Sequence, residues 1–330
     1  MTDPTTPRRV YLTGGAGFIG GAVARLLRRR ANSVVAVVRD PERAADLLDI
    51  GVEVVAGDLH SMEALAGAMR GCDAVVHAAG SYRVGIPVSE RPAMLDANVG
   101  STARVLDAAI EAGVPRIVYV STGNVFGNTN GRIVDESFRR DLHQPFLSYY
   151  DETKYQAHVL ARERAQAGAP VIIAMPSQTY GPGDHSDVGA ALRAAHDGRL
   201  RYRVLETVGL SLVHVDDVAG GIVAALDRGR VRESYILGGP NLRLADALDL
   251  AARLGGHVPP RLRVSTSLLR AAARLPAGIA QAAGLPPNLG EVISAADGVT
   301  YWLSSGRASR ELGYAPRGIE GGLRDTFDVR

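Results

Sequence analysis

The chain has 330 residues, and its 37 Lys and Arg against 35 Asp and Glu give a formal net charge of +2. This balance supplies no strong positive field, so we expect neither nucleic acid nor a membrane as a partner. The single cysteine, Cys72, excludes an internal disulfide framework and a cysteine-based metal site, and we predict no metal and a cytoplasmic location.

Short apolar runs alternate with longer helical patterns through the first half of the chain. The runs lack strict alternation of polar and apolar residues, as in strands that are buried on both faces. The expected strands are Arg9–Thr13, Ser33–Val38, Val52–Ala56, Ala74–His77, Arg116–Val120 and Val171–Met175. The expected helices are Phe18–Ala31, Pro41–Ile50, Met62–Met69, Arg91–Ala112 and Ser148–Ala167. This order predicts an α/β fold with a doubly wound parallel sheet, whose ligands bind at the carboxyl ends of the strands.

The pattern becomes less regular after Met175. Gly181-Pro182-Gly183 breaks the chain, and the region from Leu244 onward is mostly helical with several prolines. Two further strands and a helix are expected at Ser211–Val215, Tyr235–Leu237 and Asp217–Arg228. We therefore predict a larger domain over residues 1–180, to which 211–240 return. Residues 181–210 and 241–330 would form a smaller, mainly helical cap over the carboxyl edge of the sheet.

The segment Thr13-Gly14-Gly15-Ala16-Gly17-Phe18-Ile19-Gly20 follows the first expected strand and opens a helix. Glycines let a backbone approach a pyrophosphate, and the helix N-terminus offers unpaired N–H groups and a positive dipole to it. A glycine turn alone is common, but the strand–turn–helix context favours a dinucleotide site. The predicted contacts are Gly14, Gly17, Phe18, Ile19 and Gly20.

Charged residues follow the second and third expected strands. Arg39-Asp40 ends the second strand, where an Arg accommodates the 2′-phosphate of NADP and an acid binds the 2′-OH of NAD. We favour NADP(H) because Arg39 is the first residue after the strand. NAD(H) remains an alternative because the carboxylate of Asp40 could turn towards the ribose. Asp40 could also be the N-cap of the next helix. Asp58, with Leu59 beside it, could bind the adenine, or Asp58 could cap the next helix.

Tyr150 and Lys154 are four residues apart on an expected helix, which puts both side chains on one face. A phenol has a pKa near ~10, and a nearby ammonium would lower it into the range of acid–base work. Lys154 is the one lysine among 37 basic residues, so lysine stands where arginine would not serve. The alternative is that Tyr150 and Lys154 are two exposed side chains on the helix surface with no catalytic role.

The segment Ser121-Thr122-Gly123-Asn124-Val125-Phe126-Gly127 leaves the fifth strand. A hydroxyl there could bind a substrate carbonyl and orient it towards Tyr150, although Ser, Gly and Asn also make ordinary turns. We assign substrate contacts to five residues, with His185 also readable as a solvated loop histidine: Ser81, Thr122, Asn124, Gln178 and His185.

As a set, these motifs resemble the extended short-chain dehydrogenase/reductase family over nearly the whole chain. The glycine loop, the STGNVFG segment and Tyr150-x-x-x-Lys154 are joined by His77-Ala78-Ala79, Asn98, Tyr180-Gly181-Pro182-Gly183, Val213–Ala219 and Glu311-Leu312-Gly313-Tyr314-x-Pro316. The resemblance implies a Rossmann domain and a nicotinamide coenzyme that contacts Ala78, Ala79 and Lys154.

The same resemblance implies the catalytic roles. Tyr150 would be the acid/base, Lys154 its partner and Thr122 the catalytic hydroxyl. Asn98 would order a proton-relay water, although on sequence alone it could simply cap or break a helix. The resemblance also implies a homodimer with a four-helix interface, formed by Arg91–Ala112 and Ser148–Ala167.

The chain departs from members that act on nucleotide sugars. Those members usually have an acidic residue at the position of Arg39, an Asn at the position of Gln178 and an Arg near the position of Gly209-Leu210-Ser211. The chain instead resembles the dihydroflavonol-reductase-like and hopanoid-associated epimerase-like branch. We therefore favour an NADP(H)-dependent reductase of a ketone or aldehyde. The alternative is an NAD(P)-dependent sugar or nucleotide-sugar epimerase or dehydratase that works by transient oxidation. A coenzyme-binding regulator is disfavoured, because it would need no acid/base.

Overall fold

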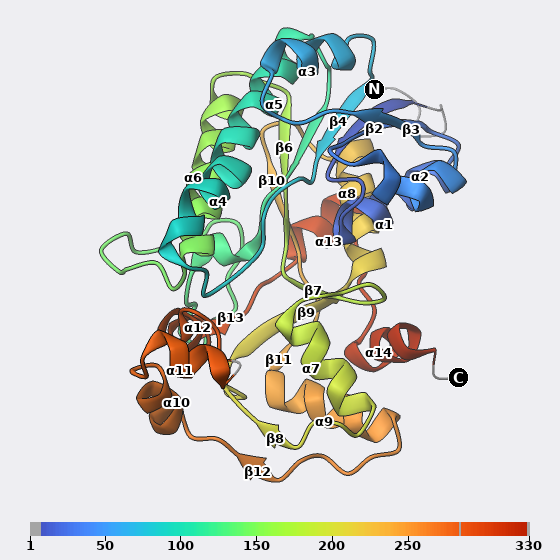
Figure 1. Cartoon of the computed structure of the whole chain (residues 1–330). Helices are drawn as coiled ribbons and strands as arrows, with labels where there is room; N and C mark the ends of the chain where they lie inside the picture. The colour runs from blue at the N-terminus through green and yellow to red at the C-terminus, as the bar shows by residue number, and fades with distance from the viewer. Residues whose placement is uncertain (1–7, 284, 329–330) are drawn as a thin grey trace.

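A seven-stranded parallel sheet forms the centre of the molecule in the computed structural model, which describes residues 8–283 and 285–328. The strand order is β10-β6-β5-β4-β1-β2-β3 (Figure 1). The strands are β1 (Arg9–Thr13), β2 (Ser33–Val38), β3 (Glu53–Ala56), β4 (Ala74–His77), β5 (Ile117–Val120), β6 (Val171–Pro176) and β10 (Ser234–Leu237). The order reverses between β1 and β4, which confirms the predicted doubly wound Rossmann fold.

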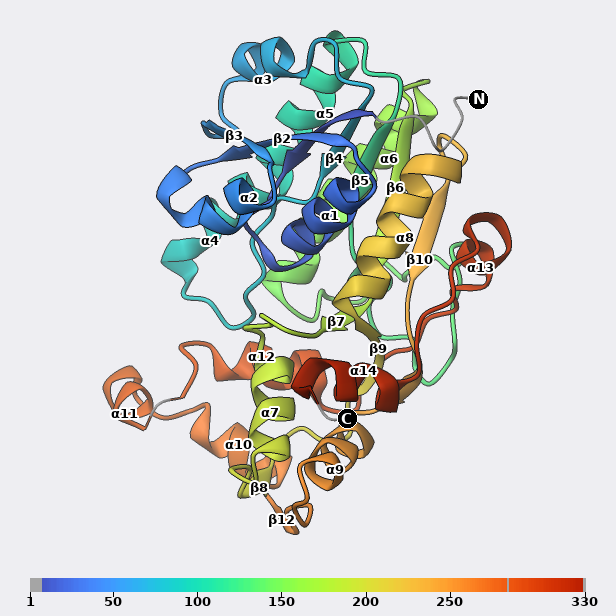
Figure 2. The same cartoon turned by 90° about the vertical axis from the view of Figure 1, so that its right-hand side faces the viewer.

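Two layers of helices cover the sheet because successive side chains of each strand point to opposite faces. In β1, Val10 and Leu12 join the core beneath α1 (Phe18–Arg29) and α8 (Val215–Arg228). Tyr11 joins the core on the other face. That face is covered by α3 (Met62–Met69), α5 (Ser101–Glu111) and α6 (Tyr149–Gln166). Figures 1 and 2 show the two layers on either side of the sheet.

Two helices expected as single pieces are divided. Residues 41–50 form a 3₁₀ turn (Pro41–Ala44) and α2 (Ala45–Asp49). Residues 91–112 form α4 (Arg91–Leu95), a π-helical turn (Asp96–Gly100) and α5. The hydroxyl of Thr102, in α5, donates to the carbonyl oxygen of Asn98 in the π turn at 2.6 Å, so a side chain competes with the backbone donors of a regular helix.

The smaller part of the molecule contains a second sheet built around β9 (Gly209–His214). Its neighbours are β7 (Gln178–Tyr180), β11 (Asn241–Arg243) and β13 (Thr300–Tyr301), and β8 (Tyr202–Arg203) pairs separately with β12 (Leu262–Arg263). The helices are α7 (Asp187–His196), α9 (Leu244–Leu254), α10 (Thr266–Ala272), α11 (Ala277–Ala282), α12 (Leu289–Ala296), α13 (Gly306–Leu312) and α14 (Ile319–Phe327).

The strand expected at Ser211–Val215 is β9 and belongs to this second sheet, so the chain returns to the central sheet at α8 rather than at Ser211. Every residue of β9 is buried, and its apolar run therefore looks like that of a central strand. Strands β7 and β8 and helix α7 are further elements that we did not predict from the sequence. Of the helices in the described ranges, none is long and apolar enough to cross a bilayer.

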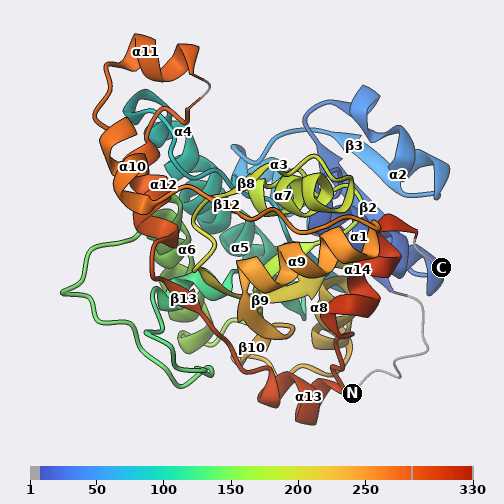
Figure 3. The ribbon, with the colours of Figure 1, turned by 90° about the horizontal axis from the view of Figure 1, so that it is seen from below.

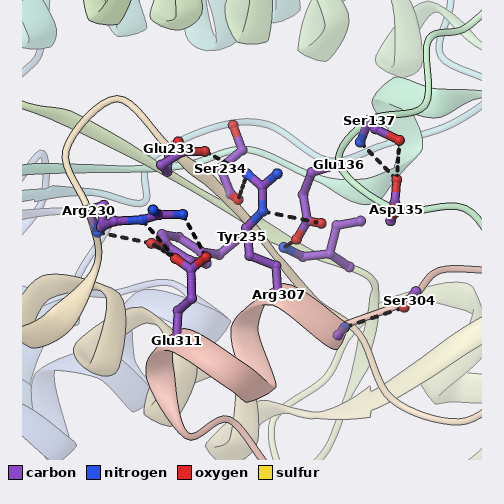
Figure 4. A network of polar contacts seen from close by, with 12 residues as sticks. Asp135, Glu136, Ser137, Arg230, Glu233, Ser234, Tyr235, Ser304, Arg307 and Glu311 are labelled. Atoms are coloured by element: carbon purple, nitrogen blue, oxygen red, sulfur yellow. Dashed lines mark hydrogen bonds and ion pairs between the residues drawn. The ribbon is translucent and has the colours of Figure 1, made fainter.

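Polar contacts join the loop after β5 and helix α13 to the edge strand β10 (Figure 4). The backbone N–H of Ile236 donates to the buried carboxylate of Glu136 at 2.9 Å. Burial raises the pKa of Glu136 above its usual value. From α13, Arg307 pairs with Glu233 at 2.6 Å, so both segments are fixed along the same side of β10.

Candidate active site

A cavity of about 720 Å³ lies where the carboxyl ends of the central strands face the smaller part of the molecule. It brings together most of the predicted site residues: Gly14, Gly17, Phe18, Ile19, Gly20, Ala78, Thr122, Asn124, Tyr150, Gln178 and His185. The other predicted residues do not line it: Arg39, Asp58, Leu59, Ala79, Ser81, Asn98 and Lys154.

The glycine loop leaves no room for side chains. Gly14 has φ +73°, and a Cβ there would lie 2.6 Å from the backbone nitrogen of Ala79. A Cβ on Gly20 would lie 2.0 Å from the carbonyl oxygen of Gly14. Helix α1 begins after Gly17, whose N-cap position makes no side-chain capping bond. Uncapped N–H groups in a tight glycine cradle fit the pyrophosphate of a dinucleotide.

The ends of β2 and β3 lie outside this cavity. Arg39 is exposed, and Asp40 precedes the 3₁₀ turn that begins at Pro41. Asp58 accepts the backbone N–H of His60 at 2.9 Å. The N-cap of α3 is Ser61, whose hydroxyl accepts the N–H of Ala64, so Asp58 does not cap that helix.

Helix α6 carries the Tyr150–Lys154 pair on a buried face. The hydroxyl of Ser148 caps the helix by accepting the N–H of Asp151 at 3.1 Å. Tyr150 is 8% exposed and lines the cavity. The buried ammonium of Lys154 donates to the hydroxyl of Tyr119 at 3.3 Å and to the carbonyl oxygen of Val120 at 3.2 Å. This burial excludes the reading as an exposed helix pair.

The electrostatics of Tyr150 differ from the sequence-based expectation. We expected the Lys154 ammonium to lower the pKa of Tyr150, whereas burial, above all, raises that pKa above its usual value. The ring packs edge-on against Tyr82 at a centroid distance of 4.8 Å. A hydrogen bond with Thr122 acts in the opposite, lowering direction. The ammonium of Lys154 binds Tyr119 and Val120 instead, and with its pKa above the ordinary value Tyr150 is protonated at neutral pH.

Thr122 and Asn124 belong to a 3₁₀ turn (Gly123–Phe126) that follows β5. The hydroxyl of Thr122 caps this turn by accepting the N–H of Asn124 at 3.2 Å, so the segment is both a turn and a wall of the cavity. The Asn124 amide donates to Asp151 at 3.0 Å.

Sequence reasoning missed Asp151, a buried carboxylate beside Tyr150. One of its oxygens accepts from Asn124, and the other is buried without a hydrogen-bond partner. Burial raises its pKa to about 6 from an ordinary value of 3.8. The signal was ambiguous, because an acid three residues after the N-cap Ser148 looks like a common helix-capping residue.

Asn98 joins the loop after β4 to α6. Its amide nitrogen donates to the carbonyl oxygen of Ser81 at 3.0 Å and to the hydroxyl of Thr153 at 2.9 Å. Its oxygen accepts the N–H of Ser81 at 2.7 Å. The residue lies in the π turn rather than at a helix cap, and such turns are frequent at functional sites.

The outer wall of the cavity is mainly apolar and was also missed. It is formed by the loop after β4 and the segment around the start of α12, from which the apolar lining residues are Tyr82, Val84, Ile86, Pro87, Pro286, Pro287 and Val292, beside Gly80, Arg83, Gly85 and Glu90. A Cβ on Gly85 would lie 2.9 Å from Val292, so the two segments are in close contact. Among the described lining residues Arg83 is the one Arg or Lys, and its guanidinium pairs with Glu90.

Known proteins resemble the chain in sequence. The family model of the NAD dependent epimerase/dehydratase family matches residues 10–238. A putative dihydroflavonol 4-reductase of Synechocystis sp. is 29% identical, with 96% of this chain and 92% of that protein covered. The 4-hydroxy-2-methyl-3-oxo-4-farnesyl-3,4-dihydroquinoline-1-oxide ketoreductase of Stigmatella aurantiaca is 31% identical, with coverage of 94% and 92%.

Solved structures share the fold. The crystal structure of gox2253 has a TM-score of 0.82 and 32% identity, covering 98% of this chain and 97% of that one. The dTDP-glucose 4,6-dehydratase DesIV from Streptomyces venezuelae, a double mutant with NAD and DAU bound, has a TM-score of 0.77 and 26% identity, with coverage of 97% and 96%. Together with the glycine cradle and the Tyr150–Lys154 pair, these matches establish that the chain belongs to the NAD-dependent epimerase/dehydratase family of extended short-chain dehydrogenases/reductases.

Proposed function

We propose that the protein is an NADP(H)-dependent oxidoreductase that reduces an apolar ketone or aldehyde. The observation that carries this proposal is the outer wall of the cavity, whose apolar side chains line the same cavity as Tyr150. A nucleotide-sugar substrate would bring a diphosphate, which proteins bind through Arg and Lys. Arg83 is already paired with Glu90, and the wall therefore suits an apolar carbonyl compound better.

The inner wall supplies the polar groups for such a reduction. The hydroxyls of Tyr150 and Thr122 would donate to the substrate carbonyl oxygen and polarise it. The nicotinamide coenzyme supplies the hydride when bound. Because burial raises the pKa of Tyr150, the phenol holds its proton and can deliver it to the alkoxide that forms. Lys154 would bind the ribose of the coenzyme. Asn98 would hold α6 in place and order the proton-relay water.

The substrate would lie between the two parts of the molecule, with the larger part as dinucleotide-binding domain and the smaller part as substrate cap. Gln178 and His185 reach the cavity from the cap side, and Ser81 is held beside it by Asn98. The names of the Synechocystis reductase and the Stigmatella ketoreductase support reduction of a carbonyl group.

We further propose NADP(H) as the coenzyme, because the exposed Arg39 ends β2 at the position that meets the adenosine ribose. Asp58 and Leu59 would contact the adenine, and Ala78 and Ala79 the coenzyme beyond the glycine loop. We place the reaction in the cytoplasm, supported by the free buried thiol of Cys72. The enzyme would act as a homodimer through α5 and α6, which an Arg164–Asp107 ion pair of 2.9 Å joins into one surface.

A second candidate is a sugar dehydratase or epimerase, favoured by the structural similarity to DesIV, which is named a dTDP-glucose 4,6-dehydratase. The two functions differ in coenzyme turnover, since a transient-redox enzyme regenerates and retains its nucleotide. The test is to measure nucleotide in the protein as isolated, then NADPH consumption with apolar ketones and with nucleotide sugars. We expect little bound nucleotide, and NADPH consumption with a ketone that yields the alcohol. Conversion of a nucleotide sugar without net coenzyme consumption would favour the second candidate.

A further inference from the structure

Basic residues are unevenly distributed along the chain. Residues 250–290 contain five arginines and no Asp or Glu, although the whole chain is nearly balanced. We refer to residues 250–283, which hold all five arginines, as the basic segment. Two of its arginines form ion pairs, Arg263 with Glu206 and Arg270 with Asp297, and the other three form none within the described part of the chain. The segment therefore carries a local positive charge that the net charge of +2 conceals.

The basic segment also exposes large apolar side chains. Five of them are between 42% and 80% exposed: Val258, Leu262, Leu268, Leu275 and Ile279. The strand pair β8–β12 adds Tyr202, which lies directly opposite Leu262 and is 51% exposed. Single exposed apolar residues are normal on a protein surface, but five of them within 22 consecutive residues indicate a surface that something covers.

Helix α10 contacts the rest of the protein through polar side chains and exposes an apolar side chain. Thr266 and Arg270, four residues apart, both contact Asp297 at the end of α12, at 3.0 and 2.8 Å. Leu268 lies midway between them, on the opposite side of the helix, and is 61% exposed. No residue of α10 is buried. A surface helix normally turns its apolar side chains inward, whereas α10 keeps Leu269 half-buried and leaves Leu268 exposed to a partner.

These elements belong to the smaller part of the molecule. Figure 1 shows β8 and β12 at its lower end, with α10 and α11 above them on the left, and Figure 3 shows α10 and α11 extending from one corner. Pro286 and Pro287, which line the cavity, follow the basic segment in the chain. The exposed surface thus adjoins the cap wall of the candidate active site.

We propose that the basic segment is a docking surface for an anionic lipid bilayer. A bilayer interface offers apolar depth for the leucines and negative headgroups for the arginines. A second copy of the chain would bring the same arginines together, three of them without an ion pair, which disfavours self-association through this face. The segment lies on the membrane rather than crossing it, because no described helix can span one. This inference does not depend on the proposed reaction.

Vesicle binding by the full-length protein tests the proposal. We expect the protein to co-sediment with phosphatidylcholine vesicles that contain phosphatidylglycerol at least tenfold more strongly than with phosphatidylcholine alone, and salt should weaken this binding. Replacing Leu268 and Ile279 together by Ser should reduce binding to the anionic vesicles at least tenfold. Replacing Arg261 and Arg274 by Ser should have a similar effect and leaves the apolar residues in place.

The matched control is Leu48→Ser, which removes a leucine of 53% exposure from α2 and should leave binding unchanged. Melting temperatures show whether each variant is folded, and the arginine variant keeps the test valid if the apolar variant is not. Absence of binding to anionic vesicles, equal binding to neutral ones, or an equal loss in Leu48→Ser would overturn the proposal. Sedimentation that shows a dimer lost only in the Leu268 and Ile279 variant would also overturn it, in favour of self-association.

Discussion

The side-chain amide of Asn124 donates to the carboxylate of Asp151 across 3.0 Å, and this bond ties the turn after β5 to the helix that carries Tyr150. A carboxylate can only accept, so the NH₂ group of Asn124 must face Asp151. The amide oxygen of Asn124 then lies 3.5 Å from the hydroxyl of Thr122. Asp151 therefore acts, through Asn124, as a positioning residue for the hydroxyl of Thr122.

Asp151 should make stability depend on pH in a specific direction. Its folded pKa of about 6 lies above its ordinary value of 3.8, so the folded state binds the proton more tightly. The corresponding stabilisation is present below pH 3.8 and is lost as the pH rises through 6. We expect the stability difference between wild type and Asp151→Asn to fall by roughly 3 kcal/mol over this range. Urea unfolding at several pH values measures it.

The exposed Asp141→Asn variant is the control for that experiment, and its difference from wild type should not show this step. A wild-type minus Asp151→Asn difference that stays constant with pH would contradict the raised pKa.

Tyr150→Phe should abolish turnover while leaving coenzyme binding nearly intact, because only the transferable proton is lost. General acid–base groups typically contribute 10²–10⁴-fold, and we expect a loss of roughly that size in kcat. Steady-state kinetics with the ketone found in the substrate screen, and coenzyme titration by fluorescence, measure the two effects. Tyr149→Phe on the same helix is the matched control. Activity of Tyr150→Phe within a factor of two of wild type would remove the assignment.

Lys154→Arg should also inactivate the enzyme although the charge is kept. The ammonium is buried, with acceptors on Tyr119 and Val120, and a planar guanidinium cannot occupy that space with the same bonds. We expect at least a tenfold loss of kcat/KM. Circular dichroism and thermal unfolding separate this loss from misfolding. Wild-type activity in a folded Lys154→Arg protein would contradict a catalytic requirement for lysine at position 154.

The coenzyme preference should depend on Arg39. A guanidinium pairs with a 2′-phosphate through charge-assisted hydrogen bonds of about 1.5–3 kcal/mol each, so wild type should prefer NADPH to NADH by roughly ten- to a hundredfold. Arg39→Ala should weaken NADPH binding and leave NADH binding nearly unchanged, as fluorescence titration of both coenzymes would show. Asp40→Ala should strengthen NADPH binding if its carboxylate repels the phosphate. A wild-type preference for NADH that survives Arg39→Ala would overturn the NADP(H) assignment.

The predictable parts of this molecule are those encoded by local sequence. The glycine loop could be placed because a strand, a turn and a helix follow each other within residues 9–29. The cap wall could not, because it depends on the approach of Gly85 to Val292, residues far apart in the chain. Membership of β9 in the second sheet was missed for the same reason, since burial of a strand does not reveal its partners.

Side-chain direction was the other limit. The spacing of Tyr150 and Lys154 correctly placed both on one buried helix face, but it could not show that the ammonium binds Tyr119 and Val120. Nor could it show that Asp151 turns to Asn124 instead of remaining a helix-capping acid. These directions follow from tertiary packing, which a single sequence does not record.

The contact between Glu136 and Ile236 protects one edge of the central sheet. Strand β10 is an edge strand, and an edge with unpaired N–H groups can recruit a strand from another molecule. The Glu136 carboxylate already holds the Ile236 N–H, and an incoming strand would have to displace it. Loss of Glu136 should therefore first appear as aggregation of the protein during expression, while molecules that stay monodisperse keep their chemistry.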